Sequence, residues 1–384
     1  MPSAMPDVVI VGARVAGAAT ALLLARLGHE VLVLDRASMP SDTLSTHQIA
    51  RTGVLALRRW GVLDAVVASG TPLLRDITFH ADSSVTRPIK DKFGLDFLVS
   101  PRRYVLDTLL GEAAVAAGAT IRTGVAVAGV HLDDTGRATG VFGHDRLGSR
   151  VDVSARFVVG ADGLGSRVAR SVGAPLVVDR GLGGFTRYAY YADLPTSGIE
   201  MYTTERCLAG IFPTHGGEAC VWLCGPRSRP AWSFDAHLRA SVPALAERLP
   251  AARRTSPVRS MLRAPNHVRR AHGPGWALVG DAGYHRDPVS AHGISDAFRD
   301  AELLAVALDA ALRGSPTALA HYEAARAAAL ADIFELTCAL SAYPPVPEFV
   351  ELMGQLGAAI DVESANLAGR PVPALVPAQS TKEI

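Results

Sequence analysis

The chain has 384 residues, of which 49% are hydrophobic and 20% are charged, a composition typical of a globular enzyme. Its length allows two or three domains, and its formal net charge of +1 gives no electrostatic reason to expect a nucleic-acid partner. It shows no signal segment and no charge-free apolar run of about 18 residues, so we expect a cytoplasmic protein without a membrane span.

The predicted elements begin with a strand, a helix and a second strand. Val8 to Val11 is a continuous apolar run, a helix follows from Gly12 to Leu27, and the apolar run from Val31 to Leu34 ends at Asp35. Short connections between such elements are typical of a βαβ unit, which usually opens a parallel sheet. The sequence therefore predicts an α/β fold with a Rossmann-like first domain.

The middle of the chain is richer in strand patterns. Residues 74–100 alternate loosely between apolar and polar side chains, and residues 120–160 suit a meander of strands. Between 183 and 270, short β-rich stretches are broken by Gly and Pro, which predicts a second, antiparallel sheet inserted into the first domain. Helical patterns cover much of 293–365, and we expect the tail over 369–384 to be extended or disordered.

The four cysteines, Cys207, Cys220, Cys224 and Cys338, form no CxxC pair. Cys220 and Cys224 are expected to share one face of a strand. This pattern favours packed thiols over a disulfide or a metal site, so we expect no metal.

The first motif, Gly12-Ala13-Arg14-Val15-Ala16-Gly17, lies between the first strand and the first helix. A full dinucleotide fingerprint has three glycines, and here Arg14 replaces the middle one. Gly12 still permits the tight turn and Gly17 the close packing of helix on strand, but the Arg14 side chain must turn aside or lie along a phosphate. Asp35, followed by Arg36, ends the next strand, where an acidic group can hold a ribose hydroxyl. The pattern predicts dinucleotide binding.

Two further motifs also follow strands. Gly160-Ala161-Asp162-Gly163 continues into a basic stretch, and in isolation it is also explained as an acidic turn before a basic helix start. Residues 280–297 connect the strand at 276–279 to a long Ala/Leu helix through a turn rich in Gly, Pro and His. Such a turn places an acidic side chain and free backbone N–H groups beside a bound anion or polar ring. Two such elements, so far apart in the chain, suggest one large cofactor held from both ends.

In order and spacing, the three motifs resemble the fingerprints of FAD-dependent monooxygenases of the para-hydroxybenzoate hydroxylase type. That superfamily also includes geranylgeranyl reductases and flavin-dependent halogenases, and the resemblance covers roughly residues 7–310. We expect a discontinuous FAD-binding domain over 1–75, 100–182 and 271–320, a β-rich substrate domain over 76–99 and 183–270, and a C-terminal helical region and tail over 321–384.

The resemblance implies roles for the residues that match the family's motifs. Gly12, Gly17 and Asp35 would hold the ADP half of FAD, with Arg14, Ala16 and Arg36 beside them. The other matches are Arg103 near the pyrophosphate, Asp162 and Gly163 on FAD and pyridine nucleotide, Asp281 on the sugar-alcohol chain, and Pro288, Gly293 and Ile294 against the isoalloxazine ring. Arg103 has the alternative of being a solvated cation at a helix start.

This chain departs from the family after Pro288. The family often has Gly-Gln-Gly-x-Asn there, whereas this chain has Ala291-His292-Gly293-Ile294-Ser295. His292 and Ser295 are therefore expected to face or flank the flavin, and the enzyme's specific chemistry should be sought there.

Three histidines are candidate catalytic residues: His47, His285 and His292. His47 lies in a loop that resembling enzymes run past the FAD toward the substrate, with helix capping as the alternative. A neutral imidazole suits deprotonation of a phenol, so His285 could be a general base; a structural hydrogen bond is the alternative.

Candidate substrate-binding residues lie on one strand, at Arg187, Tyr188 and Tyr190. The alternation of side chains along a strand prevents Arg187 from sharing a face with the two tyrosines, so the set cannot all point into one cavity.

The predicted function is an FAD-dependent monooxygenase that uses NADH or NADPH and O2 on a small aromatic or polyketide-like metabolite. As the resemblance implies, oxygen would be transferred through a flavin C4a-hydroperoxide. The alternative is an FAD-dependent reductase of isoprenoid double bonds, because Ile211-Phe212-Pro213 resembles a turn of those enzymes. A halogenase is disfavoured, since the Trp-x-Trp-x-Ile-Pro motif and its lysine are missing. A small molecule is the expected partner, and the protein a monomer or homodimer.

Overall fold

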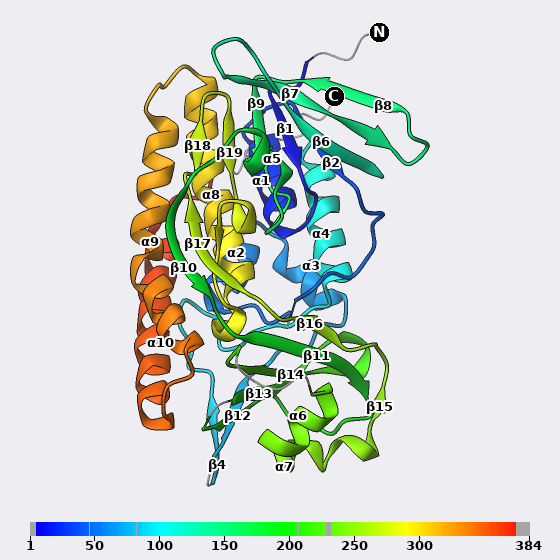
Figure 1. Cartoon of the computed structure of the whole chain (residues 1–384), viewed down its shortest axis with the longest axis vertical. Coiled ribbons are helices and arrows are strands. Elements are labelled where there is room, and N and C mark those ends of the chain that lie inside the picture. Colours follow the sequence, from blue (N-terminus) through cyan, green and yellow to red (C-terminus); the bar gives the residue numbers. More distant parts are fainter. Residues whose placement is uncertain (1–4, 46, 82, 206, 228–231, 374–384) are drawn as a thin grey trace, which may run out of the picture.

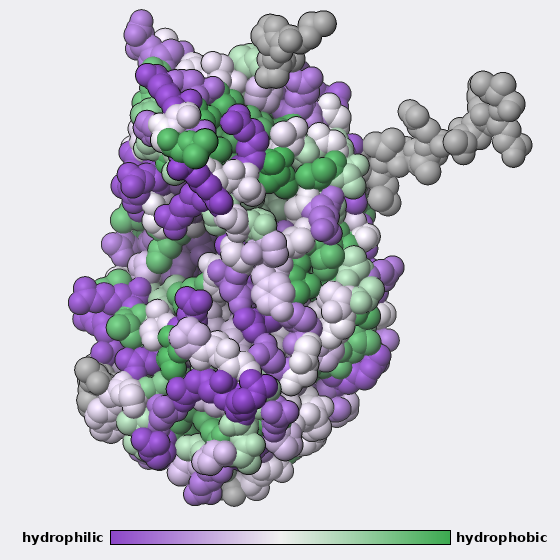
Figure 2. All heavy atoms as spheres, turned by 90° about the vertical axis from the view of Figure 1, so that its right-hand side faces the viewer, coloured by the Kyte–Doolittle hydropathy of each residue, from purple (hydrophilic) through white to green (hydrophobic). Residues whose placement is uncertain are grey.

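The computed structural model describes residues 5–373 except 46, 82, 206 and 228–231. A parallel sheet and its helices occupy the upper part of Figure 1, an antiparallel sheet occupies the lower part, and two long C-terminal helices run along one side. The face shown in Figure 2 mixes hydrophilic and hydrophobic residues and is indented between the upper and lower parts.

The parallel sheet has the strand order β18-β19-β9-β1-β2-β5. Its strands are β1 (Val8–Val11), β2 (Val31–Asp35), β5 (Thr120–Thr123), β9 (Phe157–Gly160), β18 (His272–Gly273) and β19 (Trp276–Leu278). All neighbouring pairs are parallel except β18 with β19.

Both faces of this sheet are covered, which explains why its strands are continuous apolar runs. On one face, Val8 and Ile10 pack with the helices α1 (Val15–Arg26), α4 (Arg103–Ala116) and α8 (Gly293–Leu312). On the other face, Val9 and Val11 pack with a three-stranded sheet and α5 (Arg167–Ser171). That sheet consists of β6 (Val125–Leu132), β7 (Ala138–Asp145) and β8 (Arg150–Ser154).

The lower sheet has eight strands in the order β15-β11-β14-β13-β12-β3-β4, with β16 paired to β11. Its strands are β3 (Asp76–His80), β4 (Ser84–Pro88), β11 (Phe185–Ala192), β12 (Ile199–Thr204), β13 (Cys207–Pro213), β14 (Glu218–Gly225), β15 (Arg253–Arg254) and β16 (Arg259–Met261). Only the β3–β12 pair is parallel. One face packs against α6 (Phe234–Ser241) and α7 (Pro243–Ala246), and the other against the C-terminal helices.

A second three-stranded sheet connects the two larger sheets. It contains β10 (Leu176–Leu182), β17 (Pro265–Arg269) and β20 (Tyr284–His285). Just after it, the buried Asp287 accepts hydrogen bonds from the backbone N–H groups of Gly184, at 2.7 Å, and Val289, at 2.9 Å. One carboxylate therefore fixes the start of β11 to the turn that leads into α8.

The remaining helices are α2 (Arg51–Arg59), α3 (Leu63–Ala68), α9 (Ala318–Ser341) and α10 (Val346–Gly369). Among the described residues, none of the helices combines the length and the apolar character that a membrane span needs. None of the four cysteines forms a disulfide, and Cys220 and Cys224 share one face of β14 as expected.

The predicted α/β fold, with its inserted, largely antiparallel sheet and C-terminal helices, is confirmed. The boundaries of the expected FAD-binding domain, substrate domain and C-terminal region stay a prediction. The sheet of β10, β17 and β20 takes strands from both the expected FAD-binding domain and the expected substrate domain. Of the tail over 369–384, residues 374–384 lie outside the described part of the chain.

The packing of α1 on β1 gives a stability prediction. A Cβ on Gly17 would lie 1.8 Å from the carbonyl oxygen of Gly12, whereas a Cβ on Gly111, in α4, would meet its nearest neighbour, a methyl of Ile121, at 3.6 Å. Gly17→Ala should therefore lower the free energy of unfolding by about 1–3 kcal/mol. Gly111→Ala should leave it unchanged or raise it by up to about 1 kcal/mol, because alanine favours helix. Urea denaturation of the flavin-free protein measures both values, and equal stabilities would contradict this account of the turn.

Candidate active site

The three sequence motifs meet at one edge of the parallel sheet. Gly12, Asp162 and Asp281 follow the carboxyl ends of the adjacent strands β1, β9 and β19, where Gly160 is in register with both Val11 and Leu278. Gly12 has a φ of +106°, and a Cβ there would lie 2.4 Å from the carbonyl oxygen of Ala161. Ligands of open α/β sheets bind at this edge.

The first and third motifs are in direct contact. Gly280 has a φ of +57°, and a Cβ on it would lie 2.9 Å from the Cβ of Ala16. The start of α1 and the turn before α8 are therefore held together by backbone packing that leaves no room for a side chain at position 280.

The Arg14 side chain is turned aside from the glycine turn. Its guanidinium bonds Asp107 at 2.8 Å and the Ser41 hydroxyl at 2.8 Å, and it also donates to the Ser41 carbonyl. Arg103 bonds the other oxygen of the same buried Asp107 at 3.0 Å. Two guanidinium groups share one carboxylate, so one positive charge remains in excess beside α1.

This arrangement suits a pyrophosphate. No side chain caps the first turn of α1, and that turn contains no acidic residue, so its N–H groups are free to bind an anion. The excess positive charge of the arginine pair adds to the same electrostatic preference. The residues at this end of the site fit the diphosphate of FAD.

Asp35 and Asp162 both hold the protein backbone. The carboxylate of Asp35 accepts from the N–H groups of Ala13 and Ala37, each at 2.7 Å, which fixes the glycine turn. Arg36, beside it, is exposed. The carboxylate of Asp162 accepts from the Ser166 hydroxyl at 2.5 Å and from the N–H of Arg167 at 2.5 Å, and thus caps α5. Asp162 thus forms the acidic turn before a basic helix that the sequence offered as an alternative. A contact of Asp162 or Gly163 with FAD stays a prediction.

Asp281 differs from these carboxylates, because it is exposed and has no hydrogen-bond partner among the described residues. After it, the short 3-10 turn Pro288–Ser290 and the left-handed Ala291, with φ of +50°, lead into α8. Gly293 and Ile294 begin α8 without a side-chain cap. An unpaired carboxylate and a set of free N–H groups fit the polyol chain and the polar edge of a flavin.

His47 lies buried against the face of the lower sheet that is turned away from α6 and α7. Its ring stacks on Tyr190, with centroids 5.4 Å apart, and meets Tyr188 edge-on at 6.1 Å. Neither ring nitrogen has a hydrogen-bond partner among the described residues, and the φ of His47 is +68°, a strained backbone for a non-glycine residue. Burial, with the nearby charges of Arg103 and Arg102, lowers the pKa of His47 well below its ordinary value.

The face beneath His47 carries an aromatic floor, defined here as Tyr188, Tyr190, Phe212 and Trp222. Phe212 and Trp222 stack at 5.1 Å. Within the described part of the chain, the Tyr190 hydroxyl and the Trp222 Nε1 are buried without hydrogen-bond partners, whereas the Tyr188 hydroxyl accepts from the Ser45 N–H at 3.1 Å. The aromatic floor thus combines flat apolar surface with unused hydrogen-bonding groups.

Arg187 lies apart from Tyr188 and Tyr190, the other two candidate substrate-binding residues. Arg187 lies on the opposite face of β11, where it donates to the Trp232 carbonyl and approaches the His237 Nδ1 at 3.3 Å. Side chains alternate along a strand, as the sequence already indicated, so Arg187 cannot line the aromatic floor.

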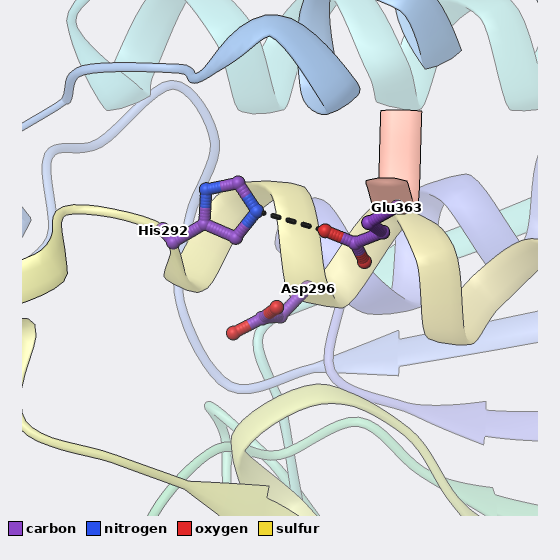
Figure 3. A group of neighbouring side chains, drawn as sticks. All are labelled: His292, Asp296 and Glu363. Atoms are coloured by element: carbon purple, nitrogen blue, oxygen red, sulfur yellow. Dashed lines mark hydrogen bonds and ion pairs between the residues drawn. The ribbon is translucent and has the colours of Figure 1, made fainter. Parts of the chain in front are cut away.

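His285 and His292 lie in different surroundings. The Nδ1 of His285 bonds the carbonyl of Pro265 at 2.6 Å, which is the structural hydrogen bond considered as its alternative role. The His292 Nε2 bonds Glu363, in α10, at 3.0 Å (Figure 3), and its Nδ1 is buried without a hydrogen-bond partner among the described residues. A catalytic role for any of the three histidines stays a prediction.

His292, Asp296 and Glu363 come together like metal ligands in Figure 3. Both carboxylates, however, are already bound by guanidinium groups. Arg299 Nη1 bonds Asp296 and Glu363, each at 2.9 Å, and the Nε of Arg286 bonds Asp296 at 2.9 Å. A cation would have to displace two buried arginines, so we interpret the group as an ion-pair cluster.

Several residues of the site escaped the sequence analysis. Arg102 donates to Asp42 and, at 2.6 Å, to Glu218, and its guanidinium lies 3.5 Å from the centre of the Tyr190 ring. Because Asp42 lies in the same loop as His47 and Glu218 lies in β14, Arg102 connects this loop to β14. The i, i+4 spacing of Arg103 and Asp107 was a visible signal, whereas no sequence pattern links His292 to a glutamate 71 residues away.

Comparisons with known proteins bear on the site as a whole. A family model described as "FAD binding domain" matches residues 5–337. The chain is 28% identical over 338 residues to menaquinone reductase of Mycobacterium tuberculosis, covering 79% of this chain and 76% of that one. It is 30% identical to kynurenine 3-monooxygenase of Stenotrophomonas maltophilia, covering 77% and 70%. The fold is also that of the myxobacterial chondrochloren halogenase, with a TM-score of 0.77, 22% identity and coverage of 86% and 81%.

Asp281→Asn tests the flavin end of the site. Loss of a charged acceptor should weaken FAD binding about tenfold to a hundredfold, because hydrogen bonds to charged groups contribute about 1.5–3 kcal/mol. Stability of the flavin-free protein should stay within about 0.5 kcal/mol, since Asp281 has no hydrogen-bond partner in the part of the chain that the structure describes. Fluorescence titration with FAD measures the change, and Asp332→Asn, another exposed aspartate, is the control. Unchanged FAD affinity in Asp281→Asn would show that the assignment is wrong.

His47→Asn tests the buried imidazole through the pH dependence of stability. Its folded-state pKa lies below the unfolded value of about 6.5, so the unfolded chain takes up the proton first and stability falls as pH drops below that value. Loss of His47 should reduce the decrease in unfolding free energy between pH 7 and 5 by up to about 2 kcal/mol. Asparagine tolerates the left-handed backbone.

Burial also lowers the pKa of His267 to about 4, so the difference between the wild type and the variant isolates His47. The exposed His321→Asn serves as control in the same urea titrations. An identical pH dependence in wild type and His47→Asn would contradict the buried, neutral imidazole.

Proposed function

Because this chain belongs to the FAD binding domain family, we propose that it is a monooxygenase that inserts oxygen from O2 into a small aromatic or polyketide-like metabolite, with NADH or NADPH as the electron source. Membership of this family supports a flavin-dependent oxidoreductase. The similarity to kynurenine 3-monooxygenase supports oxygenation as the reaction type.

The aromatic floor is the observation that carries the substrate class. A buried polar group without a partner costs about 1–3 kcal/mol, and four such atoms gather here, on His47, Tyr190 and Trp222. A planar substrate with hydroxyl or carbonyl groups would satisfy these atoms and stack on the rings. Proteins keep unsatisfied buried groups mainly where a ligand or water completes them.

Bound FAD would accept electrons from the nicotinamide and supply the chemistry with oxygen. The protein's own groups would then bind and orient. The free N–H groups of α1 and the arginine pair hold the diphosphate, Asp281 holds the polyol chain, and the start of α8 stabilises negative charge on the ring. The neutral imidazole of His47 can accept a hydrogen bond from a substrate hydroxyl.

Exclusion of water from the site follows from packing. The aromatic floor continues into buried aliphatic side chains of α9 and α10, among them Ile333, Leu340 and Leu356. A dry, closed site protects reactive species from unproductive hydrolysis. In Figure 1, α9 and α10 run along the side of the molecule and extend down to the lower sheet.

The same aliphatic surface favours a second candidate function, a reductase of isoprenoid double bonds. An apolar chain attached to a flat head group would fit an aromatic floor that borders on Leu340 and Leu356. The 28% identity to menaquinone reductase supports this alternative. Both candidate enzymes would use FAD, but the monooxygenase would insert oxygen from O2 into its product and the reductase would not.

Labelled oxygen separates the two. The purified yellow protein would be reduced with NADH or NADPH in the presence of candidate aromatics, and then exposed to ¹⁸O2. One labelled oxygen atom in the product supports the monooxygenase. A product that gains two hydrogens without oxygen uptake would establish the reductase and contradict the proposal.

Tyr190→Phe tests the aromatic floor. Removal of the unpartnered hydroxyl should lower kcat/KM about tenfold or more, because a neutral to charge-assisted hydrogen bond to substrate contributes about 1–3 kcal/mol. FAD content should not change. The matched control is Tyr191→Phe, since Tyr191 lies on the opposite face and its hydroxyl binds Arg254 at 3.0 Å. Equal kcat/KM values for the two variants would exclude the aromatic floor as the substrate surface.

A further inference from the structure

The ion-pair cluster at the start of α8 connects the proposed flavin end of the site to a helix outside the matched family segment. Glu363 lies in α10, beyond residue 337, where the family match ends. Its Oε2 bonds the Nε2 of His292 at 3.0 Å, and its Oε1 bonds Arg299 at 2.9 Å. Each oxygen of one buried carboxylate thus has its own partner.

His292 is the residue immediately before α8. Its carbonyl oxygen accepts the N–H of Asp296 at 3.0 Å, and the left-handed Ala291 precedes it. His292 is 1% exposed, and in Figure 3 its Nε2 faces Glu363. The backbone and the carboxylate together leave the imidazole little freedom of orientation.

The Nδ1 of His292 is the unpartnered imidazole atom of this cluster. It is buried and has no hydrogen-bond partner among the described residues. Arg286 bonds Asp296, and Arg299 bonds Asp296 and Asp300, while Asp300 Oδ2 and the neighbouring Ser295 Oγ are also buried without a hydrogen-bond partner in the described part of the chain. A purely structural ion pair would not require a free ring nitrogen beside the first turn of α8, whose N–H groups are uncapped.

We propose that Glu363 is a positioning residue, which holds the His292 imidazole so that its Nδ1 forms a hydrogen bond with the isoalloxazine ring of bound FAD. The proposal rests on the proposed function only in taking the flavin ring to lie at the start of α8. A ligand group oriented by a buried carboxylate is a common way in which proteins tune a cofactor. A hydrogen bond to the ring changes the relative affinity for oxidised and reduced flavin, and with it the midpoint potential.

A double-mutant cycle on the midpoint potential tests this coupling. The holoenzymes of wild type, His292→Gln, Glu363→Gln and the double variant are titrated anaerobically, without substrate, after their FAD content has been measured. Each single change should shift the ratio of the two affinities about tenfold, which is about 30 mV for a two-electron couple. The double variant should show no further shift than His292→Gln alone, because Glu363 acts through His292.

Controls separate positioning from folding. Glu302 is a buried carboxylate in α8 that binds Arg59 at 3.3 Å and Trp60 at 3.2 Å and touches neither His292 nor Glu363. Glu302→Gln should therefore leave the midpoint potential unchanged. If Glu363→Gln yields no holoenzyme, Glu363→Asp takes its place in the cycle. Aspartate keeps the charge for Arg299 but is one methylene too short to hold His292 in the same position.

The proposal is overturned if the Glu363 variants bind FAD with the wild-type potential, or if the shifts of Glu363 and His292 variants simply add. These measurements need neither substrate nor oxygen. Failure of the monooxygenase assignment would therefore leave them intact, and an oxygenating enzyme with unshifted potentials would refute the role of Glu363 alone.

Discussion

The carboxyl edge of the parallel sheet is the constraint on which the rest of the molecule depends. β1, β9 and β19 are neighbours in register, so the turns that follow them must meet, although β1 and β9 are about 150 residues apart along the chain and β9 and β19 about 120. The meeting is possible only because Gly12 and Gly280 present no side chain to Ala161 and Ala16. The strand order and the glycines at these two positions therefore bring the two ends of the cofactor site together.

The distribution of carboxylates divides this edge into supporting and binding groups. Asp35, Asp107, Asp162 and Asp287 are all satisfied by backbone N–H groups or by arginines, and they fix the turns and loops in place. Asp281 alone among these motif carboxylates is exposed and unpaired within the described chain. Where the protein has already satisfied a charge, that group supports the fold, and where it has not, the group is available to a ligand.

Sequence patterns predicted the layers well, because periodicity and glycine turns are local signals. The apolar run of β1, the glycine turn at Gly12, and the opposite facing of Arg187 and Tyr188 all follow from local rules. Contacts between distant segments did not follow. The two arginines on Asp107 and the reach of Glu363 to His292 depend on how α4 and α10 pack. The aromatic floor was seen only in part, since its rings come from three strands.

The central claim is that one FAD extends from the start of α1 to the start of α8. A crystal structure of the holoenzyme tests it most directly. The account predicts the diphosphate at the N–H groups of Val15 and Ala16, the polyol chain on Asp281, and the ring against Gly293 and Ile294 with the aromatic floor across from it. A flavin ring bound away from α8, or a diphosphate away from α1, would contradict the account.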